Sequence, residues 1–147
     1  EHVVPLNAAL LKERNELMEQ KDFLHSSFHY ARQFSAADII VIAAPYWDLT
    51  FPAVLKDYLE RINVAGIVFQ YRKDGSMQSL CKSKQLIYVT TAGGPIMEPN
   101  LGYEIIRQMA ASFFGITAFS YFKAEGLDIV GADAEKILRQ AEQDIKL

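Results

Sequence analysis

The chain has 147 residues, of which 50% are hydrophobic and 22% are charged. This length and composition are typical of one globular domain with a core of its own. The net charge is −3, from 15 basic and 18 acidic residues without a basic cluster, which disfavours nucleic acid and anionic membranes as partners. No apolar run reaches the length of a transmembrane helix and no signal peptide is visible, so we expect a cytoplasmic protein.

The single cysteine, Cys81, excludes an internal disulfide framework and agrees with a reducing compartment. Lys82 and Lys84 stand close to it in the sequence, where they could lower the pKa of its thiol. No histidine stands near it, however, so we expect an incidental thiol. The three histidines are scattered and no metal-ligand cluster is evident, so we predict no metal site.

The first third of the chain predicts two helices followed by a strand. Apolar residues are sparse over 8–23, which indicates a surface helix, and Ser26 or Ser27 can cap a second helix. Residues 39–44 are continuously apolar and rich in β-branched side chains. They predict a strand buried on both faces, as in a parallel sheet, and Pro45 should end its pairing.

An aromatic loop over residues 46–51 follows this strand and leads into an amphipathic helix over 52–64. Residues 67–80 predict a short hairpin whose turn contains an Asp-Gly pair. Such a hairpin is too short to belong to the parallel sheet. We expect it beside the main sheet or against another subunit.

The second half of the chain predicts two more strands and two more helices. A buried strand over 85–91 runs into Ala92-Gly93-Gly94-Pro95. Paired glycines permit positive φ and close approach to a ligand, although a tight turn alone explains them equally well. A helix over 102–114, a strand over 116–122 and a helix capped by Asp133 complete the chain. The expected buried face of the last helix consists of Ile137, Leu138, Ala141 and Ile145.

The regular alternation of strands and helices predicts an α/β fold, a doubly wound parallel sheet with right-handed crossovers, as a single domain over residues 1–147. In such sheets ligands bind at the carboxyl ends of the strands. Residues 45–51 and 91–94 occupy that position and are the candidate ligand-binding loops.

Six segments match one family in unbroken order. Residues 36–49 read Ala-Ala-Asp-Ile-Ile-Val-Ile-Ala-Ala-Pro-Tyr-Trp-Asp-Leu and residues 51–61 read Phe-Pro-Ala-Val-Leu-Lys-Asp-Tyr-Leu-Glu-Arg, with further matches at 65–71, 90–94, 113–116 and 124–128. Together they resemble the FMN-dependent NADH-azoreductases and NAD(P)H:quinone oxidoreductases of flavodoxin-like fold. Each segment alone is weak, but the ordered set is fairly specific.

The resemblance implies an FMN-dependent homodimer in which NAD(P)H reduces the flavin by hydride transfer and a quinone or azo compound reoxidises it, in a ping-pong cycle. The cofactor carries the chemistry, so no catalytic side chain is expected. The implied FMN-binding residues are Pro45, Tyr46, Trp47, Asp48 and Leu49 along the isoalloxazine ring, and Thr91, Ala92, Gly93 and Gly94 on its pyrimidine side. The amide near Asp48 would face flavin N5. The implied substrate pocket consists of Trp47, Phe69 and Tyr71, with Tyr71 approaching from the neighbouring subunit near a two-fold interface.

The sequence departs from this family at its beginning. The family's first strand, its Ser-rich phosphate loop and its first helix have no counterpart in residues 1–147. We therefore expect a flavodoxin-like domain that is incomplete at the amino end, with an unpaired apolar strand edge and weak FMN binding. Two other functions stay open: a flavodoxin-type electron carrier, and a non-catalytic remnant of the fold that binds no FMN.

Overall fold

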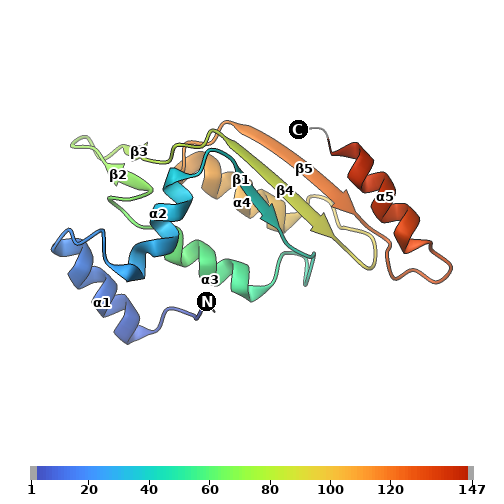
Figure 1. The fold of residues 1–147 in the computed structure, drawn as a ribbon, viewed down its shortest axis with the longest axis horizontal. Coiled ribbons are helices and arrows are strands. Elements are labelled where there is room, and N and C mark those ends of the chain that lie inside the picture. Colours follow the sequence, from blue (N-terminus) through green and yellow to red (C-terminus); the bar gives the residue numbers. More distant parts are fainter. Residues whose placement is uncertain (1–2, 146–147) are drawn as a thin grey trace.

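A three-stranded parallel sheet forms the centre of the computed structural model, which describes residues 3–145. The strands are β1 (Ile40–Ala43), β4 (Gln85–Thr91) and β5 (Ala118–Ala124), in the order β1-β4-β5 (Figure 1). Ile40 lies opposite Leu86, and Gln85 lies opposite Ala118. The predicted parallel sheet is therefore confirmed, and the carboxyl ends of its strands meet at one edge.

The helices are α1 (Ala8–Glu19), α2 (His29–Ala36), α3 (Ala53–Ile62), α4 (Leu101–Phe113) and α5 (Ala134–Asp144), with a 3₁₀ turn, η1 (Ser26–Phe28), ahead of α2. Side chains of α2, α3 and α4 form one core with the inward side chains of β1 and β4, as where Phe34 packs edge-on against Phe114 at 4.7 Å between ring centroids. Helix α5 lies beside β5 (Figure 1). None of the helices in the described part of the chain is long and apolar enough to cross a membrane.

The predicted hairpin is present as β2 (Phe69–Tyr71) paired antiparallel with β3 (Met77–Ser79). Gly75 takes φ 81° in its turn, as the Asp-Gly signal requires. Phe69 is buried and packs edge-on against Phe113 of α4, with 5.5 Å between ring centroids. The hairpin therefore docks on α4 through Phe69, and on the residue that ends α4 through the Ser79 hydroxyl, which donates to the Phe114 carbonyl at 2.5 Å. It remains outside the parallel sheet.

Local signals place the ends of the later helices. Asn100 caps α4 by accepting from the Tyr103 N–H at 3.0 Å, and Gly115 follows the helix with φ 63°. Asp133 caps α5 by accepting from the Lys136 N–H at 3.0 Å, as predicted. The predicted serine cap of the second helix is wrong, because the N-cap of α2 is Phe28, which makes no side-chain hydrogen bond. The His25 ring caps the preceding η1 by accepting from the Ser27 N–H.

Two burial expectations are wrong. Strand β1 alternates rather than being buried on both faces: Ile40 and Ile42 are buried, but Val41 is 61% exposed because nothing in residues 3–145 covers its face of the sheet. Helix α5 has no buried residue, and Leu138 on its expected inner face is 39% exposed. The periodicity of these segments predicted their type correctly but could not show what covers them.

The effect that neighbouring lysines could have on the pKa of Cys81 is outweighed by burial. The thiol is buried, and this burial raises its pKa to about 11, although nearby Lys84 acts in the opposite direction. Its Sγ contacts the Val68 carbonyl at 3.5 Å. Cys81 is thus a core residue with an unreactive thiol, in agreement with the incidental reading.

Candidate functional site

The loop that leaves β1 makes a tight turn with an unusual backbone. Trp47 and Thr50 exchange two backbone hydrogen bonds, at 3.3 Å from the Trp47 N–H and at 2.8 Å from the Thr50 N–H. Between them Asp48 and Leu49 have φ of 49° and 68°, a left-handed pair that normally calls for Asn-Gly. Strain of this kind is concentrated at functional sites.

Helix α4 packs against the end of this turn. A Cβ on Gly102 would come within 3.0 Å of the Thr50 carbonyl carbon and 3.1 Å of the Phe51 ring. The missing side chain therefore allows α4 to pack directly against the end of the loop. Phe51 itself is buried in the core.

The loop after β4 lies beside the first loop. The Tyr46 N–H donates to the Thr91 carbonyl at 2.8 Å, and the Met97 N–H donates to the Tyr46 hydroxyl at 3.3 Å. Tyr46 thus joins the two loops and is half-buried, whereas Trp47 is 60% exposed. The two predicted loops form one continuous edge.

This edge presents hydrogen-bond donors without acceptors. The amides of Asp48, Leu49, Gly93 and Gly94 have no acceptor within residues 3–145. A Cβ on Gly94 would meet no atom within 4 Å, so its backbone faces open space. A hollow of about 260 Å³ lies next to these loops, between the carboxyl ends of β1 and β4, and is lined by Ala43, Ala44, Pro45, Val89, Thr90 and Thr91.

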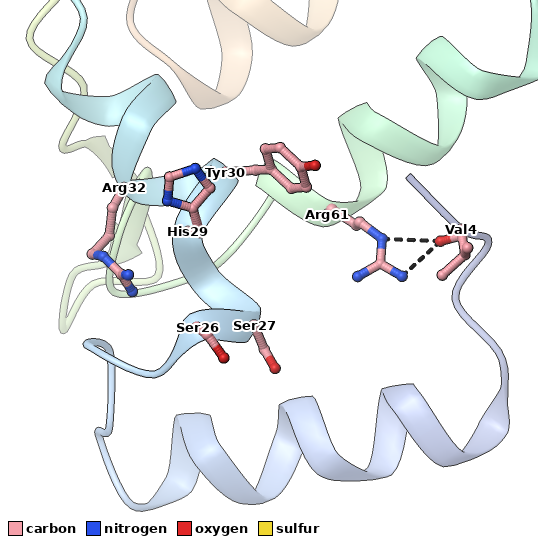
Figure 2. A pocket seen from close by; sticks show the side chains of 7 residues that line it. All are labelled: Val4, Ser26, Ser27, His29, Tyr30, Arg32 and Arg61. Atoms are coloured by element: carbon pink, nitrogen blue, oxygen red, sulfur yellow. Dashed lines mark hydrogen bonds between the residues drawn. The ribbon is translucent and has the colours of Figure 1, made fainter. Parts of the chain in front are cut away.

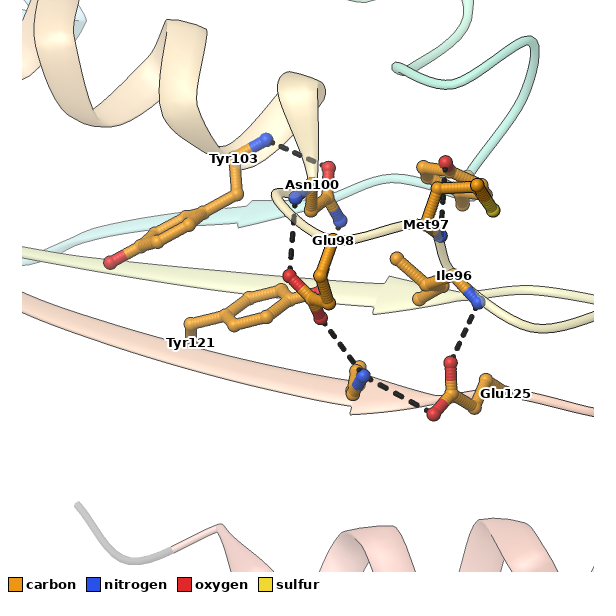
Figure 3. Close-up of polar contacts among 9 residues, drawn as sticks. Ile96, Met97, Glu98, Asn100, Tyr103, Tyr121 and Glu125 are labelled. Carbon is orange, nitrogen blue, oxygen red and sulfur yellow. Dashed lines mark hydrogen bonds and ion pairs between the residues drawn. The ribbon is translucent and has the colours of Figure 1, made fainter.

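A network of ion pairs and hydrogen bonds joins the loop after β4 to the end of β5 (Figure 3). Glu125 Oε2 accepts from the Ile96 N–H at 2.7 Å, and this bond lowers the pKa of Glu125. Lys123 Nζ lies 3.0 Å from Glu98 Oε1 and 3.2 Å from Glu125 Oε1, and its hydrogen bond to Glu98 raises its pKa. The Asp128 carboxylate lies over Gly93, where a Cβ would overlap it.

The structure brings together most, but not all, of the residues singled out from the sequence. Residues 45–49 and 91–94 adjoin one another. Phe69 is buried, and the hairpin lies at the other end of the sheet from these loops (Figure 1), so one copy of the chain does not bring Tyr71 near Trp47. Tyr71 is nevertheless 65% exposed.

The residues of the ionic network were missed as site residues. Their charges carry no motif, and Lys123 and Glu125 lie far in sequence from Glu98. A signal was available, since the loops that follow adjacent parallel strands must lie side by side.

A larger hollow of about 520 Å³ lies between the segment around Val4, which precedes α1, and the helices α2 and α3 (Figure 2). Its basic side chains already have partners. Arg61 donates to the Val4 carbonyl at 2.6 and 2.9 Å, and Arg32 donates to the carbonyls of Phe23 and His25 at 2.7 and 2.8 Å. This hollow is separate from the edge formed by the two loops.

Residues 3–147 match the family described as having a flavodoxin-like fold. The chain belongs to this flavodoxin-like family. Its relatives include the FMN-dependent NADH:quinone oxidoreductase 2 of Clostridium acetobutylicum, 41% identical over 133 residues, which are 87% of this chain and 64% of the relative. The FMN-dependent NADH:quinone oxidoreductase of Clostridium beijerinckii is 39% identical over 118 residues, or 80% of this chain and 59% of the relative. The flavodoxin-like chain thus spans about three fifths of the length of these two relatives.

Solved structures agree with the flavodoxin-like fold. An azoreductase of Bacillus anthracis strain Sterne is 24% identical and superimposes with a TM-score of 0.78 over 98% of this chain and 74% of that chain. An FMN-dependent NADH-azoreductase of Bacillus anthracis Ames Ancestor, in complex with FMN, is 20% identical and gives a TM-score of 0.77 over 98% and 73%. At these identities the likeness concerns the fold alone.

Proposed function

We propose that this chain carries the flavin-binding edge of an FMN-dependent NAD(P)H oxidoreductase that transfers electrons to quinones or azo compounds. One observation carries the proposal: two adjacent loops at the carboxyl edge of the sheet present the open amides of Asp48, Leu49, Gly93 and Gly94. The names of the two clostridial relatives, which refer to FMN and NADH:quinone oxidoreductase, support the same function. The reducing cytoplasm is the proposed location.

The donor set fits an aromatic ring whose edge accepts hydrogen bonds. FMN, when bound, would supply the hydride chemistry. The Asp48 and Leu49 amides would hold one side of the ring, and the Gly93 and Gly94 amides would stabilise negative charge on the other side. Trp47, with its exposed indole, would supply apolar area and exclude water. The strained turn would hold the Asp48 and Leu49 amides in the orientation that binds the ring before the ligand is present.

We also propose that the active species is a homodimer. The exposed Tyr71 reaches the proposed substrate pocket only if a second copy supplies the hairpin, because the hairpin and the two loops occupy opposite ends of one chain (Figure 1). Phe69 is buried against α4 and would support the hairpin rather than line the pocket. Helix α4 offers a surface for a second copy. An apolar groove of about 550 Å³ along it includes Leu101 and Ile105, which are 45% and 41% exposed.

The test is flavin retention after dialysis. Purified chain is mixed with FMN, dialysed and examined by its visible spectrum, and intact mass is measured on the same sample. Retained, spectrally shifted flavin supports the proposal, and its absence would count for the non-catalytic alternative. Gly94→Val is the matched variant, because a Cβ there would meet no protein atom within 4 Å and the added side chain would occupy the open side of the loop. We expect an unchanged unfolding midpoint and FMN affinity at least tenfold weaker.

One observation favours the electron-carrier alternative. Asp48, Glu98 and Asp128 are exposed around the two loops, and such carboxylates could guide a basic protein partner. Steady-state NADH oxidation with a quinone separates the two functions. Sustained turnover by the flavin-loaded chain identifies the oxidoreductase, whereas retained flavin without turnover identifies the carrier.

A further inference from the structure

The segment over residues 93–97, called the glycine loop below, has no secondary structure of its own. It contains two glycines and a proline and begins two residues after the end of β4. Glycines leave a backbone many accessible conformations. If the amides of Gly93 and Gly94 are to face a ligand in one arrangement, neighbouring segments have to hold them there.

Backbone contacts hold only the first half of the glycine loop. The Asp128 N–H donates to the Gly93 carbonyl at 2.9 Å, and the Gly126 N–H donates to the Gly94 carbonyl at 3.2 Å. Just before the loop, the Ala92 N–H donates to the Ala124 carbonyl at 2.8 Å. No backbone bond of this kind holds Ile96 within the described residues 3–145.

Two side chains hold the second half of the glycine loop: the Tyr46 hydroxyl accepts from the Met97 N–H at 3.3 Å, and Glu125 holds the preceding amide (Figure 3). Glu125 Oε2 accepts from the Ile96 N–H at 2.7 Å, a charge-assisted bond to a residue that is only 5% exposed. The other oxygen of the same carboxylate lies 3.2 Å from Lys123 Nζ. Lys123 in turn pairs with Glu98 just beyond the loop, at 3.0 Å. The carboxylate is therefore oriented from one side while it holds the loop from the other.

We infer that Glu125 is a positioning residue that fixes the path of the glycine loop and thereby the two glycine amides that would meet FMN. This inference rests on the function proposed above. Glu125 itself lies behind the loop and acts through Ile96. Lys123 and Glu98 set the direction of its carboxylate.

Four variants separate this role from general stabilisation of the end of β5. Glu125→Ala removes the acceptor, and Glu125→Asp keeps the charge but shortens the reach to the Ile96 amide. Glu125→Gln keeps an oxygen that can accept the same hydrogen bond. Glu135→Ala on α5 is the matched control, because that carboxylate also pairs with a basic side chain, Arg139, at 3.2 Å but touches no part of the loop.

Two readouts are measured on the full chain: amide hydrogen exchange of Ile96 and Met97 by NMR, and FMN affinity by fluorescence titration. In Glu125→Ala and Glu125→Asp we expect Ile96 exchange to rise about tenfold and FMN affinity to fall about tenfold, the scale of a lost charge-assisted hydrogen bond. Glu125→Gln should keep Ile96 exchange and FMN affinity close to the wild-type values, and Glu135→Ala should change neither the exchange rate nor the affinity. Because Glu125→Asp keeps the charge, it provides the test even if the alanine variant does not fold.

The two readouts test the positioning role of Glu125 and the proposed function separately. Unchanged Ile96 exchange in both shortened variants would overturn the positioning role, and so would faster exchange with unchanged FMN affinity. If the wild-type chain bound no FMN, the proposed function would fail, whereas the exchange rates would still decide whether Glu125 holds the loop.

Discussion

Leu49 has a left-handed backbone with φ 68°, which leucine rarely adopts. Its side chain is 50% exposed, so shortening it sacrifices little burial. Leu49→Gly should therefore raise the free energy of unfolding by about 1 kcal/mol, because glycine adopts this conformation without strain. Urea denaturation measures the change. Leu24→Gly is the control: Leu24 is 84% exposed with ordinary φ, so glycine there should not stabilise.

The buried residues Cys81 and Tyr88 predict loss of stability in alkali. Burial raises the pKa of Cys81 from 9.0 to about 11 and that of Tyr88 from 10.0 to about 12. A raised folded-state pKa gives a contribution that is complete below the unfolded pKa and lost as the pH rises through the folded one. We expect about 2 to 3 kcal/mol to be lost between pH 9 and 11 through Cys81, and a similar loss between pH 10 and 12 through Tyr88.

Urea midpoints measured at intervals from pH 7 to 12 check this prediction. Cys81→Ala should flatten the part of the curve between pH 9 and 11, and Tyr88→Phe should flatten the part above pH 10. Tyr88→Phe should also be at least as stable as the wild type at pH 7, because the Tyr88 hydroxyl has no hydrogen-bond partner in the described residues. Identical alkaline curves for all three proteins would contradict the assignment.

At the scale of elements, α1 is attached by Leu17 and Met18, which pack against the core, and by the polar contacts of Arg14. The helix has no buried residue, but Arg14 donates to the carbonyls of Glu60 and Asn63 at 3.1 and 2.5 Å, where α3 ends and its last carbonyls lack helical partners. Arg14→Ala should speed hydrogen exchange throughout α1 and lower the free energy of unfolding by about 1 to 2 kcal/mol. Lys12→Ala, on the same helix, removes only an exposed pair with Glu16 and should leave both nearly unchanged.

Element types were predictable because each strand and helix carries its own periodicity. Strand β4 has the predicted bounds, 85–91, and α5 begins directly after its Asp133 cap. The exposed faces of β1 and α5 were not predictable, because the sequence pattern of an apolar face is the same whether or not another element covers that face. For this reason Val41 and Leu138 appeared as core residues in the sequence but are exposed in the structure.

The candidate site was predictable to the extent that its two loops follow from strand ends. The loops around Trp47 and Gly93 were identified because buried strands stop there. The left-handed turn at Asp48 and Leu49 was not, since neither residue favours it. Nor was Glu125, because its role depends on the distance to a backbone amide in another loop.

At the scale of the whole molecule, the exposed apolar row on α4 predicts self-association. Ile105 is 41% exposed beside Leu101 in the groove described above. Ile105→Arg would place a charge at the centre of that surface and should shift the chain to a monomer, as measured by light scattering over a range of concentrations. Leu24→Arg, on a distant exposed residue, is the control. A wild-type chain that stays monomeric at the highest concentration would contradict the proposed dimer.

The register of the parallel sheet also sets an order for folding during synthesis. Ile40 must wait for Leu86 before it has a ladder partner, and Gln85 must wait for Ala118. Such distant pairings form slowly, because the entropy of closing a long crossover is lost before any stabilising contact between the strands forms. The apolar segment around Val41 consequently emerges from the ribosome well before its neighbour exists. The unpaired strand edge around Val41 is therefore open to other chains during synthesis, and a translational pause after this segment has left the ribosome but before residue 85 is made should increase aggregation.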